Sequence, residues 1–346
     1  MNKEHFRQNN FDFLRFSFAF IVVVGHLIAL SKSSQLQFLH PFFNTYISVT
    51  GFFCISGFLI TRSFLSSPSL KIYFKKRMAR LLPAYVLVIS LCVIFLSQIS
   101  LYSFKEYFFN PQLYKYLLAN FSFLNFIEPC LPGVFSSNAM CAVNGALWTL
   151  KIEVAFYLFI PLLLYFVQKT KRKLVFFLVI YVLSVVYRNG LNYFADVSDN
   201  SLYAMLSRQL PGFFSYFICG VALHYYYKVF MKHKNILFLM GIILFFADKI
   251  IHFEVFAPLG LSLMVFAFAF SLKKLNNFAK FGDISYGIYI FHFPLIQLAV
   301  HFGLFERYNP FLVAFCILAA VIILGLLSWH LMEKKILNMP QTVNKF

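Results

Sequence analysis

Two ionisable side chains lie inside the first long apolar segment of the chain, which reads FDFLRFSFAFIVVVGHLIAL over residues 11–30. They belong to Arg15 and His26. A charge at the centre of a membrane-spanning helix costs about 2.5–3.5 kcal/mol on insertion scales, so such side chains usually serve a function or have a polar partner. Eleven residues advance an α-helix by about 16 Å and return it to nearly the same face. We therefore expect Arg15 and His26 to form one polar stripe that faces a protein-lined cavity.

Two simpler explanations stay open for these residues. Arg15 could extend to the inner lipid headgroups, because a long basic side chain can keep its charge in water while its stem lies in apolar surroundings. His26 could simply bond to a neighbouring helix. The catalytic interpretation depends on both residues sharing one face with further polar groups.

A buried acid follows in the fourth apolar stretch, ALWTLKIEVAFYLFIPLLLYF, which contains Glu153. Helix rise places Glu153 and His26 at similar depth in the membrane. If their two helices are neighbours, the carboxylate and the imidazole can meet. A carboxylate beside an imidazole holds it in the tautomer that a general base needs. Glu153 could instead pair with Lys151 or another cation as structural glue. We take His26 and Glu153 as candidate catalytic residues.

The stretch KIYFKKRMARLLPAY brings Arg77 and Arg80 onto one face of a helix, because they are three residues apart. Paired guanidinium groups suit phosphate oxygens by charge and by geometry. For Lys71, Lys75 and Lys76 we favour the plainer explanation of a basic cluster that contacts lipid headgroups.

A further polar face occurs in GDISYGIYIFHFPL. Ser285, Tyr286, Tyr289 and His292 recur there at helical spacing. They either line a substrate cavity or bond to neighbouring helices. We include them as candidate substrate-binding residues.

Cys130 and Cys141 differ from the other four cysteines, because both lie in the connection EPCLPGVFSSNAMC and not in an apolar stretch. A disulfide between them would tie this loop down if it faces an oxidising compartment. Spacing alone does not reveal whether their geometry permits the bond.

The composition is that of a membrane protein. The chain is 61% hydrophobic and 12% charged, with a mean hydropathy of +0.76, whereas soluble domains are about 25% charged. The net charge of +18 comes from short basic clusters between apolar runs, as the positive-inside rule predicts. We expect no binding of nucleic acid, because no stretch remains for a soluble domain to carry it.

Ten apolar stretches are long enough to span a bilayer, which takes about 17–25 residues. They are residues 11–31, 42–63, 82–101, 146–167, 173–190, 208–227, 235–251, 255–272, 283–303 and 310–332. Connections on the side of the N-terminus carry roughly three times as many Lys and Arg residues as the opposite connections, which predicts that both termini are cytoplasmic. The sequence thus predicts an all-α polytopic bundle, with one domain over residues 1–346.

One long outward-facing connection is expected at about residues 104–145. Its aromatic-rich part, YFFNPQLYKYLLANFSFLNF, either lies in the membrane interface or folds back onto the protein.

Several motifs in sequence order resemble the integral-membrane acyltransferase 3 family across almost the entire chain. They are FDFLRFSFAFIVVVGH, TGFFCISGFLIT, KKRMARLLPAY, LWTLKIEVAFYLFIPLL, ISYGIYIFHFPL and SWHLMEK. Arg15 and His26 match the arginine-to-histidine signature of that family, and Glu153 matches its characteristic acid. Thr149 and Lys151 depart from the usual serine and neutral residue. Many relatives carry a fused esterase-like domain, and this chain resembles the stand-alone members.

The resemblance implies transfer of an acyl group, most often acetyl, from cytoplasmic acetyl-CoA to a hydroxyl of a surface glycan beyond the bacterial inner membrane. A lipopolysaccharide O-antigen or another lipid-linked oligosaccharide is the expected acceptor, and no metal is expected. Arg77 and Arg80 would hold the CoA phosphates, with Arg15 near the entry. His26 would take the hydroxyl proton or carry the acyl group briefly, and Glu153 would orient it.

Two other functions account for part of the pattern. A transporter or flippase also needs ionisable residues inside the membrane, although the sequence lacks the matching pair of interrupted helices that many transporters have. A membrane scaffold would leave Arg15 and His26 dispensable. Acyl transfer is the interpretation that uses all of the motifs.

Overall fold

The computed structural model describes residues 9–338, apart from the side chains of Lys273 and Phe281. Within that range the protein is all-helical, and its only β-type pairing is an isolated bridge between Cys130 and Ala142. The α-helices are α1 (Phe11–Ser31), α2 (Thr45–Leu65), α3 (Leu70–Leu96), α4 (Phe104–Phe109), α5 (Pro111–Phe121), α6 (Trp148–Lys169), α7 (Lys173–Ser198), α8 (Ser201–Ser207), α9 (Leu210–Tyr225), α10 (Tyr227–Lys232), α11 (Lys234–Ile251), α12 (Ala257–Ala269), α13 (Ser285–His301), α14 (Leu304–Arg307), α15 (Pro310–Ser328) and α16 (Lys334–Asn338). Short 3₁₀ helices occur at Ser34–Phe42, Ser97–Ile99, Gly145–Leu147, Lys273–Leu275 and Phe278–Phe281, and a π-helix at Trp329–Glu333.

Six helical segments in the described part of the chain are long and apolar enough to cross a membrane. They are Phe11–Ser31, Ser34–Leu65, Leu70–Ile99, Gly145–Lys169, Lys173–Ser198 and Pro310–Asn338. The other four predicted spans fall on α9, α11, α12 and α13, which are helical but shorter or more charged. The helical class is therefore confirmed, whereas the count of ten spans and the cytoplasmic termini stay predictions.

The described residues divide into two compact units. The first comprises residues 9–14, Val49–Phe74 and Ile152–Phe278. The second comprises Arg15–Ser48, Lys75–Lys151 and residues 279–338. Four helices, α1, α2, α3 and α6, continue from one unit into the other, so the division does not follow helix ends. The prediction of one domain over residues 1–346 stays a prediction.

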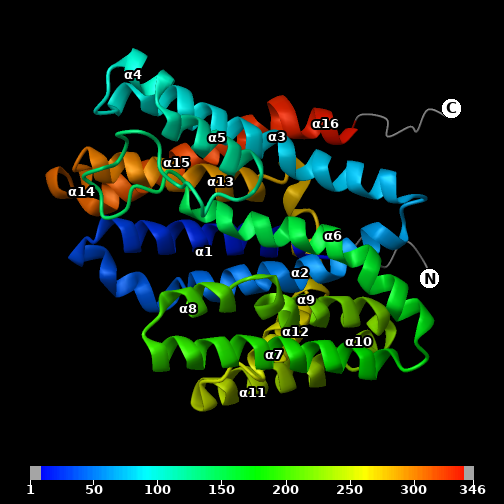
Figure 1. Ribbon diagram of the computed structural model, residues 1–346. Helices are drawn as coiled ribbons and strands as arrows, with labels where there is room; N and C mark the ends of the chain where they lie inside the picture. The colour runs from blue at the N-terminus through cyan, green and yellow to red at the C-terminus, as the bar shows by residue number, and fades with distance from the viewer. Residues whose placement is uncertain (1–8, 339–346) are drawn as a thin grey trace, which may run out of the picture. The chain divides into compact units, whose positions relative to one another are not determined.

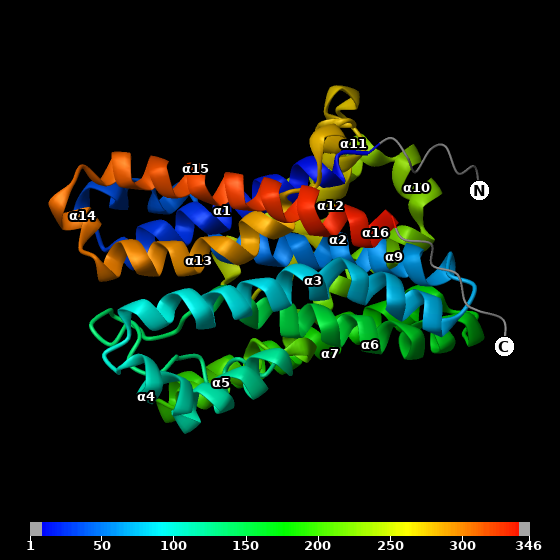
Figure 2. The ribbon, with the colours of Figure 1, turned by 90° about the horizontal axis from the view of Figure 1, so that it is seen from above.

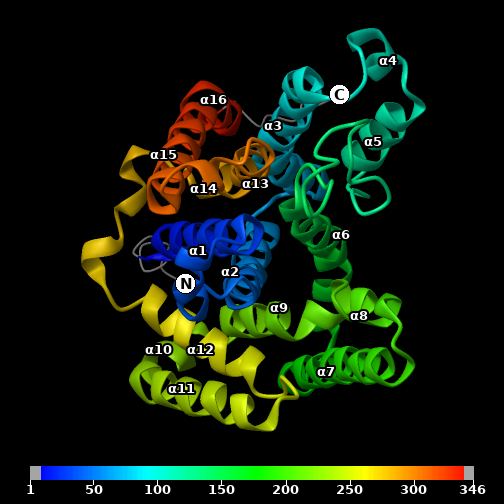
Figure 3. The ribbon, with the colours of Figure 1, turned by 90° about the vertical axis from the view of Figure 1, so that its left-hand side faces the viewer.

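In the first unit, helix backbones approach closely where side chains are smallest. A Cβ added to Gly57 of α2 would lie 2.1 Å from the carbonyl oxygen of Phe217 on α9, and one on Gly220 would lie 2.1 Å from that of Cys54. The motif SGFLI thus supplies a packing glycine. Figure 3 shows α7 beside α9 and α11 beside α12, and these pairs are in contact.

The first unit also contains a fully buried charge, Arg188 of α7. Its guanidinium donates to the carbonyl oxygens of Gly212 at 2.9 Å and Glu254 at 2.7 Å, and it pairs with the Glu254 carboxylate at 3.3 Å. A buried cation is tolerated when its donors are satisfied in this way. Arg188 therefore serves as a structural tie between α7, α9 and the turn before α12.

In the second unit, α1, α13 and α15 lie side by side (Figures 1 and 2). The α13 and α15 backbones come close enough that a Cβ on Gly287 would lie 2.7 Å from the Cα of Gly325. Helix α15 begins with Pro310 after Asn309, whose side chain accepts from the Phe311 N–H. That is a favourable start for a helix, because proline lacks an N–H and the asparagine caps a free one.

The long connection folds back onto α3 inside the second unit. The hydroxyl of Tyr107 donates to the carbonyl of Val93 at 3.0 Å, and that of Tyr85 donates to the carbonyl of Asn120 at 2.7 Å. The rings of Tyr85 and Phe123 stack with centroids 4.4 Å apart. Of the two arrangements considered for the aromatic stretch, the structure has the packed one.

Helix α3 begins twelve residues before the predicted span, at Leu70. The basic cluster is therefore part of the same continuous helix, and Pro83 lies in the helix interior instead of at the start of a span. Proline inside a membrane helix is tolerated when neighbouring groups satisfy the freed carbonyl. Pro83 frees the carbonyl of Ala79, and two residues further on, the Leu81 carbonyl accepts a further hydrogen bond from the hydroxyl of Tyr286 at 2.8 Å, which ties this part of α3 to α13.

Candidate active site

The central feature of the candidate site is a pair of histidines in the second unit. Nδ1 of His26, on α1, lies 2.8 Å from Nε2 of His292, on α13. The two rings are nearly coplanar, with 8° between their planes. His292 is completely buried, whereas His26 keeps part of its surface accessible. The accessible ring is thus backed by a buried one that fixes its orientation.

Polar contacts hold the part of α13 that carries His292. It interacts with the backbone of Ile288 and Tyr289 in the preceding turn, although Nδ1 does not reach standard hydrogen-bond geometry. The hydroxyl of Tyr289 lies 2.6 Å from the Thr149 hydroxyl, and Asn144 donates to the Ile290 carbonyl at 2.8 Å. These bonds tie α13 to the start of α6, so His292 stands on a fixed backbone.

A charge cluster lies at the other end of the same two helices. Arg15 of α1 donates to Oδ2 of Asp283 at 2.6 Å, and Arg80 of α3 donates to the same oxygen. Ser285 donates to the other carboxylate oxygen through its hydroxyl at 2.5 Å. One carboxylate therefore binds two guanidinium groups and the first residue of α13.

The electrostatics of this cluster follow from its charges. Burial disfavours the charged form of Asp283, but Arg15 and Arg80, together with the hydrogen bonds from Ser285, outweigh burial and hold the pKa of Asp283 well below its usual range. Asp283 is therefore ionised at neutral pH and neutralises part of the positive charge that two arginines would otherwise leave uncompensated.

Arg80 also contacts the end of α15. Its Nη1 lies 3.6 Å from Oε2 of Glu333, which is buried, and its guanidinium carbon lies 5.6 Å from the centre of the Trp329 ring. Glu333 accepts a further hydrogen bond from Ser328 at 2.8 Å. Glu333 is thus a buried partner of Arg80.

The remaining predicted ligands have different surroundings. Arg77 lies one turn before Arg80 on α3, half-buried. Tyr286 donates to the backbone of α3, and Tyr289 bonds to Thr149. Of the two interpretations given for the α13 polar face, bonding to neighbouring helices describes these hydroxyls, and contact with a ligand stays a prediction.

Glu153 belongs to the first unit and has its own partners there. Its carboxylate accepts from the Ser56 hydroxyl at 3.0 Å and from the Tyr157 hydroxyl at 2.8 Å. Lys151, the structural partner considered from sequence, places its Nζ 4.3 Å from the centre of the Phe126 ring. The role of Glu153 as the group that orients His26 stays a prediction.

A disulfide joins Cys130 and Cys141, whose Cα atoms are 5.3 Å apart. The loop that it closes is bound to Gln297, a buried residue of α13: Asn138 donates to the Gln297 side chain at 2.9 Å, and Gln297 donates to the carbonyls of Met140 and Ala142 at 2.9 and 2.8 Å. The disulfide loop therefore covers the C-terminal end of α13.

Sequence reasoning missed Asp283 and Gln297 as parts of the site. A signal for Asp283 was present, because the chain has 12 acidic residues against 30 basic ones and an arginine in an apolar run needs a counter-charge. Asp283 lies just before the polar helix face of residues 285–292, so it could have been proposed as the counter-charge of Arg15. Nothing in its local pattern distinguishes Gln297.

The chain is similar to known proteins over most of its length. A family model described as an acyltransferase domain matches residues 8–330, a range that includes every residue predicted from sequence for the site. An O-acetyl transferase of Shigella phage Sf6 is 27% identical over 350 residues, which covers 96% of this chain and 97% of the relative. Nodulation protein 10 of Rhizobium leguminosarum bv. viciae is 30% identical over 178 residues, covering 48% of this chain and 46% of the relative.

An uncharacterized protein of Haemophilus influenzae is 34% identical over 128 residues, covering 35% of this chain and 50% of the relative. No solved structure gives a significant match. The similarity to the phage enzyme thus covers nearly the whole length of both chains.

Proposed function

Because the chain belongs to the acyltransferase 3 family, we propose that it transfers an acetyl group from acetyl-CoA to a hydroxyl of a surface glycan, such as the lipopolysaccharide O-antigen. The name of the phage relative, O-acetyl transferase, supports acetyl as the transferred group. The observation that carries the catalytic part of the proposal is the 2.8 Å contact between His26 and His292.

The contact defines which nitrogen of His26 is the base. We assign the proton of His292 to Nδ1, so that Nε2 of His292 is the acceptor in the contact with His26. Nε2 of His292 then accepts from Nδ1–H of His26, and Nε2 of His26 carries a free lone pair. Because the partner of one ring nitrogen sets the state of the other, His292 holds His26 as a base.

The proposed reaction is a single displacement. Nε2 of His26 takes the proton of the acceptor hydroxyl while the hydroxyl oxygen attacks the thioester carbonyl carbon. The carbon–sulfur bond then breaks, and the acetyl ester forms. His26 returns the proton to the CoA thiolate, which leaves as the thiol. A positioned base contributes about 10²–10⁴-fold to such a reaction.

The donor would enter at the end of the helices where Arg15, Arg77 and Arg80 lie. Asp283 accepts a hydrogen bond from Arg80, and the Glu333 carboxylate attracts it from 3.6 Å, so both hold its guanidinium in place. A guanidinium has five N–H donors, so some remain for phosphate oxygens. Arg77, one turn away on the same face of α3, is our first choice for a CoA phosphate.

The acceptor would be reached from the end with the disulfide loop. Asp283 and His292 follow in the same order along the chain as Arg15 and His26, so α1 and α13 are parallel, and the loop closes on the C-terminal end of α13. Disulfides persist in oxidising compartments such as the periplasm. This supports a multi-pass protein of the bacterial inner membrane, with its N-terminus in the cytoplasm and His26 in the outer half.

The test is release of CoA thiol by the purified protein, measured with a thiol reagent in the presence of acetyl-CoA and the deacetylated surface polysaccharide of the native bacterium. We expect His26→Ala to lower the rate by at least about 100-fold. A wild-type protein that consumes no acetyl-CoA would favour a transporter or flippase. Unchanged turnover in a well-folded His26→Ala variant would contradict the catalytic assignment.

The donor site has its own test. Arg77→Ala should raise KM for acetyl-CoA, and Arg77→Lys should raise it less, because lysine keeps the charge but loses the forked geometry. Lys71→Ala, an exposed change on the same helix, is the matched control. Equal KM values in all three variants would remove Arg77 from the donor site.

A further inference from the structure

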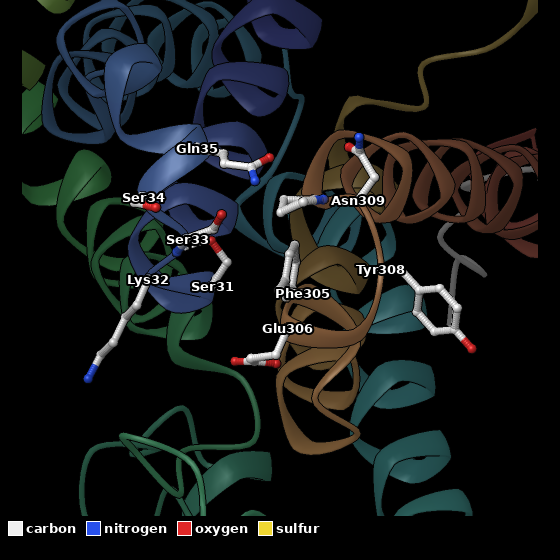
Figure 4. A pocket seen from close by; sticks show the side chains of 10 residues that line it. Ser31, Lys32, Ser33, Ser34, Gln35, Phe305, Glu306, Tyr308 and Asn309 are labelled. Atoms are coloured by element: carbon white, nitrogen blue, oxygen red, sulfur yellow. Dashed lines mark hydrogen bonds between the residues drawn. The ribbon is translucent and has the colours of Figure 1, made fainter.

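A polar pocket of about 480 Å³ opens in the second unit where α1 ends (Figure 4). Its walls come from the turn after α1 and the start of the following 3₁₀ helix on one side, and from α14 and the start of α15 on the other. Lys32 has a φ of 51° and Gly303 a φ of 62°. The chain thus makes two left-handed turns here, one after α1 and one before α14.

The lining combines hydrogen-bonding groups with an apolar surface. Gln35, Glu306 and Asn309 are exposed to solvent at the pocket, and Figure 4 shows Gln35 and Asn309 on its two sides with Phe305 between them. The Asn309 oxygen caps α15, which leaves its amide N–H₂ as a donor. Gln35 offers both a donor and an acceptor, and Glu306 offers acceptors.

This set of groups suits a sugar ring better than a phosphate. A pyranose presents several hydroxyls, each both donor and acceptor, around an apolar ring face. Glu306 would repel a phosphate, and the side chain of Lys32, the other charged residue of the lining, points away from Gln35 and Asn309 in Figure 4. The first N–H of α15, that of Phe311, is already capped by Asn309. The volume lies within the range of about 300–1,000 Å³ that small-molecule sites occupy.

The pocket is close to the proposed base along the same helix. Ser31, which lines it, is five residues after His26 on α1, or about 7.5 Å along the axis. Phe305 follows α13, the helix that carries His292, and the disulfide loop binds α13 nearby through Gln297. Five residues also turn the helix by about 140°, so the pocket and His26 lie on different faces near the same end of α1. An axial offset of about 7.5 Å is one that neighbouring residues of an oligosaccharide can span.

We propose that this pocket binds a sugar residue of the acceptor glycan next to the residue that receives the acyl group. The proposal rests on the proposed function, because it assumes that the acceptor is a glycan that approaches His26 from this end. If so, the pocket helps to determine which glycan is the acceptor. The base and the donor site do not contact the sugar next to the acylated residue and so do not select for it.

The experiment measures binding as well as transfer. Wild type, the double variant Gln35→Ala/Glu306→Gln, His26→Ala and the control Lys105→Ala, an exposed change on α4 in the same unit, are placed in nanodiscs of phosphatidylethanolamine and phosphatidylglycerol. Binding of the deacetylated native polysaccharide is measured by thermophoresis without acetyl-CoA. Transfer is measured with the polysaccharide and with methyl glycosides of its constituent sugars.

We expect the double variant to raise Kd for the polysaccharide roughly tenfold, since it removes the hydrogen-bonding groups of Gln35 and replaces charge-assisted hydrogen bonds to Glu306 by weaker neutral ones. Lys105→Ala should bind as the wild type does, and His26→Ala, which abolishes transfer, shows how much of the affinity comes from the reacting hydroxyl. Transfer to the methyl glycosides, which do not reach the pocket, should be unchanged in the double variant. If that variant aggregates, Asn309→Ser provides the same test, because serine keeps the cap and removes the amide donor.

Unchanged polysaccharide affinity in the double variant would overturn the proposal, as would a wild type without measurable affinity. Loss of a co-purifying phospholipid from that variant, seen by native mass spectrometry with glycan affinity intact, would assign the pocket to a lipid headgroup. Polysaccharide binding that depends on the pocket in a protein that transfers no acetyl group would leave the pocket standing and refute the proposed function.

Discussion

His26 and His292 meet ring to ring in the second unit, with 2.8 Å between Nδ1 of the first and Nε2 of the second. The two residues are 266 positions apart in the chain. One ring is partly accessible and the other is completely buried. This arrangement is that of a base and the group that positions it, which makes His292 a positioning residue in the proposed reaction.

The first prediction concerns His292. His292→Gln keeps an acceptor near the position of Nε2, whereas His292→Met has a similar size and no comparable acceptor. We expect the glutamine variant to retain most of kcat and the methionine variant to lose about 10–100-fold, part of the contribution of a positioned base. KM for acetyl-CoA should stay the same in both. Equal loss in the two variants would mean that His292 only fills space.

The second prediction concerns Asp283. Asp283→Asn leaves Arg15 and Arg80 without their shared counter-charge, and breaking a buried ion pair costs about 3–5 kcal/mol. We expect the low end of that range, because the two arginine side chains keep 22% and 16% of their surface exposed. A drop in Tm measured in one detergent checks it. Asp199→Asn, an exposed change, is the control, and an equal Tm for both variants would contradict the prediction.

The third prediction follows from the pKa of Asp283, which lies well below the ordinary carboxyl value. A carboxyl group whose pKa is lowered by folding stabilises the folded protein fully when the pH is above its pKa in the unfolded chain, about 3.9. This stabilisation is lost as the pH falls through the pKa of the folded protein. The difference in Tm between wild type and Asp283→Asn should therefore be constant between pH 5 and pH 8. A difference that shrinks between pH 8 and pH 5 would show that Asp283 is not held by its arginines.

The fourth prediction concerns Cys130 and Cys141. In Cys130→Ser, the thiol of Cys141 becomes free, and a membrane-impermeant maleimide added to intact cells should label it if the loop faces outward. The double serine variant is the control: Cys54, Cys92 and Cys219 are buried, but Cys316 is exposed, so its labelling must be subtracted. Loss of the disulfide should also destabilise the protein by about 2–4 kcal/mol. Labelling only after the cells are lysed would reverse the proposed topology.

The fifth prediction uses two glycines with opposite surroundings. Gly57→Ala would place a Cβ 2.1 Å from the Phe217 carbonyl oxygen, so the helices must separate, and overpacking of this kind costs about 1–3 kcal/mol. A Cβ on Gly190 meets nothing within 4 Å, so Gly190→Ala should be neutral or stabilise helix α7. The two Tm values, measured side by side, test the close packing of α2 on α9.

The predicted membrane spans agree with the observed helices in some segments and not in others. Length and hydropathy identified α1, α6 and α15 to within about four residues of their ends, because apolar residues run through almost the whole of these helices. The span predicted at 173–190 ended eight residues before α7 does, at Ser198. The same criteria missed the early start of α3, since its basic first turns do not resemble a membrane segment. They also predicted spans at α9, α12 and α13, which end sooner than the apolar runs do.

The sequence by itself determined the helical class, the membrane character, the family and the candidate residues Arg15, His26 and His292. The family follows from the resemblance of several motifs in sequence order, and the other properties follow from composition and from spacing within single segments, which sets the face of a helix on which a side chain lies. Only the tertiary structure decided that His26 meets His292 and that Arg15 shares Asp283 with Arg80. Helical periodicity does not predict which residue lies across a helix interface, because that neighbour depends on which helices pack together and in which direction.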